Sequence, residues 1–68
     1  MDKKIGFVES TYEYSGEIKS DNTNYLFFGR DLFDDVEIGD VVSFYECENT
    51  LYKRAVLVKK LTNKGLKN

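Results

Sequence analysis

The sequence contains no proline, no histidine, no tryptophan and only one cysteine among its 68 residues. Without histidine and with one cysteine, zinc sites of the usual composition and Ser-His or Cys-His nucleophile pairs are excluded. Cys47 cannot form an internal disulfide, whereas a small secreted domain normally carries several. We therefore expect a cytoplasmic protein that is not an enzyme and that holds no cofactor and no metal ion.

Long hydrophobic runs are also missing, and the patterned sequence starts near Ile5 without an apolar signal segment. The sequence thus predicts no membrane partner. A chain of 68 residues suffices for one small domain, and its five Phe and five Tyr can supply the core because aromatic side chains bury large areas. We expect a monomer in which residues 1–61 form the domain and residues 62–68 form a flexible, Lys-rich tail.

The pattern of hydrophobic and turn residues predicts five strands, at residues 5–10, 16–20, 25–29, 41–47 and 53–61. The strongest turn signal is Asp-Asn-Thr-Asn at residues 21–24, since Asp and Asn tolerate left-handed backbone conformations. Another turn is expected at residues 48–50, and a short helical turn at residues 31–33. The apolar run at residues 55–58 predicts a last strand that is buried on both sides near its middle.

Five short strands favour a small, closed antiparallel barrel. An open sheet of this size would leave unpaired edges and one apolar face in water, whereas a barrel pairs most backbone groups and encloses a single core. The sequence therefore predicts an all-β fold with five strands.

The order of these elements resembles the cold-shock domain, a five-stranded OB-fold barrel that binds single-stranded nucleic acid. The most similar stretch, Val-Glu-Ile-Gly-Asp-Val-Val-Ser-Phe at residues 36–44, resembles the family's Leu-x-x-Gly-x-x-Val-x-Phe. Residues 54–61 resemble its closing Gln-Ala-x-x-Val-x-Lys-Leu, and residues 6–8 its opening Gly-x-Val. The resemblance spans residues 4–61 and implies a small, five-stranded, antiparallel OB-fold-like barrel.

The binding motifs of that family are matched unequally. Its third-strand motif, Val-Phe-Val-His-Phe, falls on residues 25–29 and puts Leu26 and Phe28 at the exposed stacking positions. Its second-strand motif, Gly-Phe-Gly-Phe-Ile, falls on residues 14–18, where Ser15 and Glu17 replace both phenylalanines. The Lys-Trp-Phe of its first strand falls on Glu-Ser-Thr at residues 9–11. The resemblance thus implies a binding face that keeps only part of its aromatic platform.

Binding of a single strand needs flat side chains for the bases and positive charge for the phosphates. Tyr12 and Tyr14 lie in a polar turn where burial is difficult, and their spacing puts both rings on one side of an extended segment. We predict weak binding of single-stranded RNA or DNA with little sequence preference. The site residues that we expect are Tyr12, Tyr14, Lys19, Leu26, Phe28 and Arg30.

The charge distribution leaves a second function open. Residues 1–58 carry six basic and twelve acidic side chains, and the other four basic side chains are lysines after residue 58. A barrel this acidic repels a polyanion. The alternative is a protein-interaction module that keeps the OB-fold scaffold and has lost nucleic-acid binding. The acidic residues between Asp31 and Asp40 lack the ordered spacing of a calcium loop, so we expect a solvated loop there.

Overall fold

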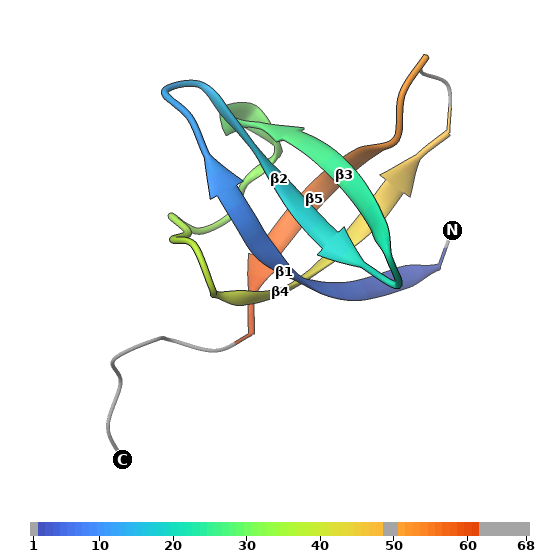
Figure 1. The fold of residues 1–68 in the computed structure, drawn as a ribbon, viewed down its shortest axis with the longest axis horizontal. Helices are drawn as coiled ribbons and strands as arrows, with labels where there is room; N and C mark the ends of the chain where they lie inside the picture. The colour runs from blue at the N-terminus through green and yellow to red at the C-terminus, as the bar shows by residue number, and fades with distance from the viewer. Residues whose placement is uncertain (1, 49–50, 62–68) are drawn as a thin grey trace.

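Five strands and one short helical turn build the computed structural model, which describes residues 2–48 and 51–61 (Figure 1). Most of the predicted turn at residues 48–50 and the whole predicted tail at residues 62–68 lie outside the described residues. Within the described part, no helix is long and apolar enough to cross a bilayer. The elements are β1 (Lys3–Thr11), β2 (Ser15–Ser20), β3 (Thr23–Phe28), the 3₁₀ turn η1 (Gly29–Asp31), β4 (Val41–Cys47) and β5 (Arg54–Lys60).

The strands close into a barrel in the order β1-β2-β3-β5-β4. The expectation of a purely antiparallel barrel is wrong at one seam, because β3 and β5 run parallel and meet at the pair Leu26 and Arg54. The other four neighbouring pairs are antiparallel. Parity is the reason: a closed ring with an odd number of strands cannot alternate in direction all the way round, so one pair must be parallel.

Local sequence explains where the elements begin and end. β4 covers the predicted residues, and β1 extends further at both ends. Asp21 and Asn22 have φ angles of 52° and 63°, which are the left-handed values that a two-residue hairpin turn requires. The helical turn begins two residues earlier than predicted, since the carboxylate of Asp31 accepts a hydrogen bond from the Phe28 backbone N–H at 2.8 Å and closes the turn there.

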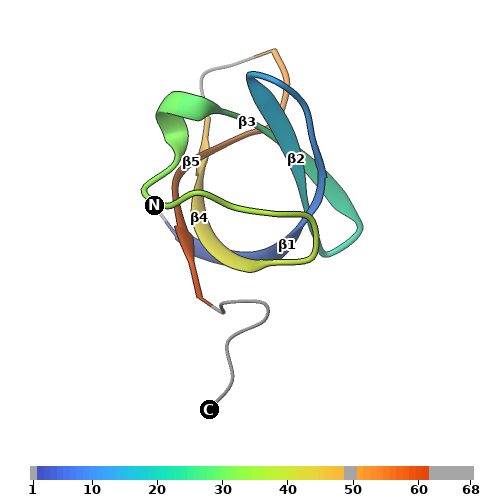
Figure 2. The same cartoon turned by 90° about the vertical axis from the view of Figure 1, so that its left-hand side faces the viewer.

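The core consists of side chains that alternate along the strands and point into the barrel. Its buried members are Val8, Ile18, Tyr25, Phe27, Val42, Phe44, Ala55 and Val58. Leu32 and Val36 pack against this core from the segment between η1 and β4. Figure 2 shows that segment crossing the near side of the barrel before it enters β4. The barrel is therefore closed by its strands and partly covered by one connection.

The prediction that the middle of the last strand is buried on both sides is wrong. Leu57 is exposed and has a φ angle of 54°, and the pairing of β4 with β5 shifts register between Ser43 and Tyr45. β5 thus contains a bulge with one extra residue at Leu57, which turns Val58 back into the core. An apolar run can therefore hold one outward residue when the strand bulges.

Candidate functional site

The pairing of β2 with β3 determines which side chains face outward. Gly16, Ile18, Tyr25 and Phe27 are buried, so the residues between them point away from the core. Across the two strands the outward pairs are Ser15 with Phe28, Glu17 with Leu26, and Lys19 with Asn24. Gly16 allows this arrangement because the Phe27 ring occupies the space that a Cβ atom would need. Leu26 and Phe28 therefore lie on the outer face, as the resemblance to the third-strand motif implied.

Phe28 is the centre of a small aromatic and cationic cluster. Its ring is half-buried at the end of β3, where η1 begins. The Cζ atom of Arg30 lies 5.1 Å from the ring centroid, and the Cζ atom of Arg54 lies 5.3 Å from it. At these distances the guanidinium groups are attracted to the ring quadrupole. The structure thus brings two of the predicted site residues, Phe28 and Arg30, together with a basic residue from β5.

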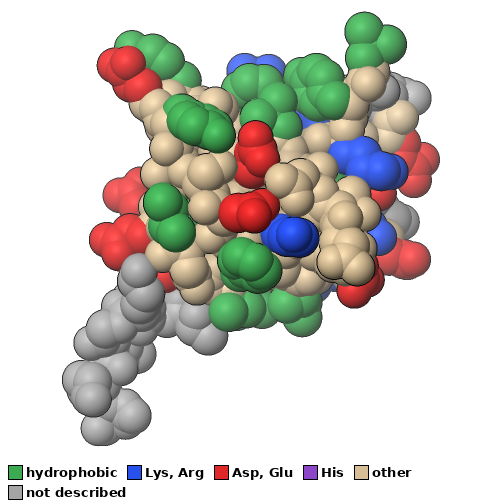
Figure 3. All heavy atoms as spheres, in the orientation of Figure 1, with side chains coloured by type: hydrophobic (Ala, Val, Ile, Leu, Met, Phe, Trp, Pro, Cys, Tyr) green, Lys and Arg blue, Asp and Glu red, His purple; other side chains and the backbone are tan. Residues whose placement is uncertain are grey.

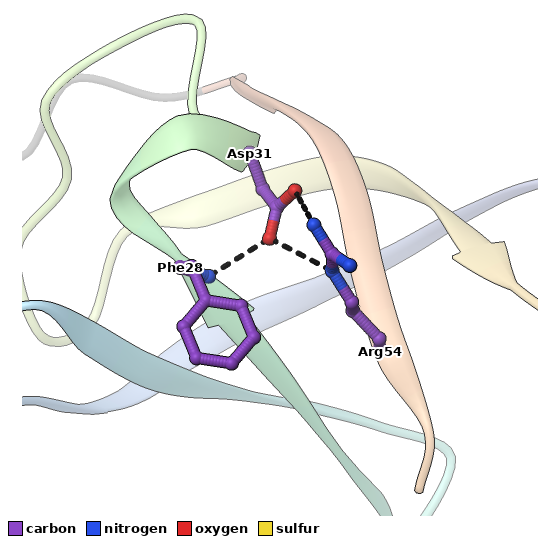
Figure 4. A network of polar contacts seen from close by, with 3 residues as sticks. All are labelled: Phe28, Asp31 and Arg54. Carbon is purple, nitrogen blue, oxygen red and sulfur yellow. Dashed lines mark hydrogen bonds and ion pairs between the residues drawn. The ribbon is translucent and has the colours of Figure 1, made fainter. Parts of the chain in front are cut away.

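Asp31 holds Arg54 in place. Its Oδ2 accepts a hydrogen bond from Nε of Arg54 at 3.2 Å, and its Oδ1 accepts one from Nη2 at 2.7 Å, as Figure 4 shows. The side chain of Asp31 is 5% exposed and that of Arg54 is 18% exposed. The hydrogen bond to Asp31 raises the pKa of Arg54 above its usual value, so the guanidinium stays charged. This two-point contact restrains the orientation of the guanidinium plane.

Tyr12 and Tyr14 lie in the β1–β2 connection, where they are 59% and 77% exposed. The Tyr12 N–H donates to the Ser15 carbonyl at 2.7 Å, and the Gly29 N–H donates to the Tyr14 carbonyl at 3.2 Å. The second bond joins the connection to the residue directly after Phe28. Both tyrosines therefore lie at the same end of the barrel as Phe28 and Arg30, beside a small cleft of about 120 Å³ that Phe27 and Leu32 also line.

Lys19 lies away from that end. It pairs with Asn24 on one side and with Phe7 of β1 on the other, while Phe28 lies opposite Ser15. At about 3.3 Å per strand residue, the step from Ser15 to Lys19 is about 13 Å. The six predicted residues therefore form one group at the end of β3 and a separate position at Lys19, next to the exposed ring of Phe7.

Acidic side chains lie between these two positions. Glu17 is the cross-strand neighbour of Leu26, and its Oε1 accepts a hydrogen bond from the Asn24 side chain at 3.0 Å. Glu9 is exposed on β1. Figure 3 shows acidic side chains near the middle of this view, with hydrophobic side chains above and below them. A phosphate backbone that crosses β1 and β2 would meet negative charge there.

Several other charged groups are used within the fold. Lys53 forms an ion pair with Glu46 at 3.1 Å, and the hydrogen bond in this pair raises the pKa of Lys53. The backbone N–H of Lys60 donates to the Asp34 carboxylate at 2.9 Å. Among the described residues, no group of three or more His, Cys, Asp or Glu side chains converges as a metal site would require.

Two outward residues near the candidate site were not among the six predicted ones. Phe7 is a candidate ring from the sequence alone, because strand alternation points it away from the core when Val8 is buried. Arg54 follows Lys53 at the start of the last strand, and this basic pair is its signal in the sequence. Its position beside Phe28 could not be found, since it depends on the parallel pairing of β3 with β5.

Comparison with known structures finds the same barrel fold in a solved cold-shock domain structure. Over 97% of its length, the chain superposes on the Drosophila Unr cold-shock structure named CSD456 with a TM-score of 0.81 and 18% sequence identity. The chain spans 29% of that longer chain. No family model matches the sequence, and no curated protein matches it either. At a sequence identity of 18%, this structural similarity establishes only that the chain folds as an OB-fold barrel.

Proposed function

We propose that this protein binds single-stranded RNA or DNA weakly and with little sequence preference, as a cytoplasmic monomer without catalytic activity. The observation that carries the proposal is the outward ring of Phe28 with two guanidinium groups beside it, on a barrel of the cold-shock type. A flat ring and nearby positive charge are the two components that single-strand binding requires.

In the proposed complex, one base stacks on Phe28 and neighbouring bases contact Leu26 and the exposed rings of Tyr12 and Tyr14. Arg30 is exposed and makes no ion pair with another described residue, so its guanidinium is available for a phosphate. Lys19 supplies a second phosphate contact at the other end of β2. Binding is weak because Ser15 and Glu17 provide no stacking surface and Glu17 repels phosphate.

An NMR titration of labelled protein with short oligopyrimidine and oligopurine strands tests this proposal, at low salt and at physiological salt. We expect saturable shifts that cluster on Tyr14, Lys19, Leu26, Phe28 and Arg30. The absence of shifts at low salt would contradict the proposal. So would shifts that occur only on the opposite side of the barrel.

A pair of phenylalanine variants tests the stacking position. Phe28→Ala removes the ring at the proposed site, and we expect binding to weaken by about 5-fold to 150-fold, because a stacked base contributes ~1–3 kcal/mol. Phe33→Ala is the control, since it removes a phenylalanine ring that is exposed but lies beyond η1, where the Phe33 backbone N–H donates to the Val58 carbonyl of β5. Equal effects of the two substitutions would show that Phe28 is not the stacking position.

The second candidate function is protein interaction, which the acidic residues Glu9 and Glu17 on the outer face favour. Acidic groups beside the apolar side chains of Leu26 and Phe28 suit a partner with basic and apolar groups. Capture of partners with and without nuclease treatment separates the two functions. A protein partner that survives nuclease supports the interaction module, and recovery of nucleic acid alone contradicts it.

A further inference from the structure

The guanidinium of Arg54 presents hydrogen-bond donors in a restrained orientation. Nε and one N–H of Nη2 point to the two oxygens of Asp31, and Figure 4 shows the third nitrogen pointing away from that carboxylate. Within the described residues, no hydrogen bond from Nη1 is present, and no side-chain polar atom is both buried and unpaired. The edge formed by Nη1 and the second N–H of Nη2 therefore faces away from Asp31, on a side chain that is 18% exposed.

Asp31 is itself restrained, so that the orientation of Arg54 is determined by two elements. The carboxylate accepts the Phe28 backbone N–H at the start of η1 while it holds the guanidinium from β5. Its side chain is nearly buried, which protects these bonds from competition by water. An arginine that is fixed in this way offers two parallel donors at a defined place on the surface.

Two parallel donors of this kind match one nucleobase in particular. Guanine presents O6 and N7 as adjacent acceptors, and arginine donates to both, whereas adenine places an amino donor beside N7. Uracil has no two adjacent acceptors, because its N3–H donor lies between O2 and O4. Cytosine has O2 and N3 side by side, but these two atoms lie closer together than O6 and N7 of guanine and match the two parallel donors less well. Asp31 also offsets the positive charge of Arg54 and so weakens its attraction for phosphate, but the directional donors remain. Arg30, which has no carboxylate partner among the described residues, is better suited to the phosphate.

We propose that Arg54, positioned by Asp31, recognises the O6 and N7 edge of a guanine base in a bound single strand. The base would lie over the outer face of β3, where Leu26 is the strand partner of Arg54 and Phe28 is its ring neighbour. This inference rests on the proposed function and adds to it one guanine-selective position in a site with otherwise little sequence preference.

The test uses base analogues, so that it needs no change in the protein. Fluorescently labelled oligouridines of about eight nucleotides, within the ~4–16 nucleotide range of an OB-fold site, are compared by anisotropy. One central uridine is replaced by guanosine, inosine, 7-deazaguanosine or adenosine.

Inosine keeps O6 and N7, whereas 7-deazaguanosine lacks N7. We expect guanosine and inosine to bind about fivefold more tightly than uridine, at the low end of the range for a bidentate contact, because the Arg54 side chain is partly exposed. Adenosine and 7-deazaguanosine should show much less of this gain.

Protein variants identify the residue that reads the base. Arg54→Lys keeps a cation next to Asp31 but removes the planar fork, so we expect the preference of guanosine over uridine to disappear. Arg30→Lys is the matched control and should keep that preference while it changes the affinity for both oligonucleotides equally. NMR spectra of each variant verify that the barrel is folded.

The outcomes separate the two proposals. Equal binding of all five oligonucleotides would overturn the guanine site and leave the proposed function standing. A purine preference that does not depend on N7, or that survives Arg54→Lys, would also overturn it. If no oligonucleotide binds at low salt, both the proposed function and the guanine site are wrong.

Discussion

At the scale of single residues, the ion pair of Asp31 with Arg54 is more deeply buried than that of Glu46 with Lys53. The carboxylate of Asp31 is nearly buried and also accepts the Phe28 N–H, whereas Glu46 and Lys53 form their pair at the surface. Asp31→Ala should lower the free energy of unfolding by about 1.5–3 kcal/mol or more. A hydrogen bond to a charged acceptor contributes this much to stability. Loss of the partner of Arg54 adds to this cost.

Glu46→Ala is the control for this prediction, since it removes a carboxylate from an exposed pair and should change stability little. Urea denaturation of both variants measures the difference. If the two variants had equal midpoints, Asp31 would not be a structural contact of the kind that the geometry indicates.

At the scale of elements, the bulge in β5 places a leucine in an unfavourable backbone conformation. Leu57 has a φ angle of 54°, a left-handed value that costs about 1–2 kcal/mol for a residue with a Cβ atom. Glycine adopts this conformation freely but loses more entropy on folding. We expect Leu57→Gly to be more stable than Leu57→Ala by about 0.5–1 kcal/mol, as measured by thermal or urea unfolding. Because both variants remove the exposed side chain, a more stable alanine variant would contradict the bulge geometry.

The outer face of β2 permits a gain-of-binding experiment. Glu17 is the cross-strand neighbour of Leu26 and occupies a position where the cold-shock resemblance implies a stacking phenylalanine. Glu17→Gln removes only the repulsion between the Glu17 carboxylate and phosphate, whereas Glu17→Phe removes this repulsion and also adds an aromatic ring. The phenylalanine variant should bind a short oligouridine about fivefold or more tightly than the glutamine variant, since stacking contributes ~1–3 kcal/mol per base. Equal affinities in a fluorescence titration would show that this strand lies outside the binding path.

Much of each element could be predicted from the sequence because it depends on neighbours along the chain. The resemblance to the third-strand motif of the cold-shock domain implied that Leu26 and Phe28 point outward, and the Asp-Asn pair identified the turn between β2 and β3. What could not be predicted depends on contacts between distant segments. Asp31 and Arg54 are 23 residues apart and meet only because β3 and β5 are neighbours in the barrel. The bulge at Leu57 likewise follows from the register with β4, which an apolar run does not reveal.

At the scale of the whole molecule, the distribution of charge matters more than its sum. The formal net charge is −2, and several basic groups are already paired: Lys53 with Glu46, Arg54 with Asp31 and Lys60 with Asp40. Lys19 and Arg30, which we propose as phosphate contacts, have no such carboxylate partner among the described residues. Few counterions should therefore be released when a strand binds, although the protein carries ten basic side chains.

This arrangement predicts a shallow salt dependence. For a single strand, the logarithm of the association constant falls with the logarithm of the salt concentration by about 0.7 per neutralised phosphate, so two contacts give a slope of about −1.4. Lys19→Ala should make the slope less negative by about 0.7, whereas Lys53→Ala should leave it unchanged because Lys53 is paired with Glu46. Anisotropy titrations from low to physiological salt measure these slopes. A slope steeper than about −3 would require contacts beyond Lys19 and Arg30, and other basic side chains of the protein would then take part in binding.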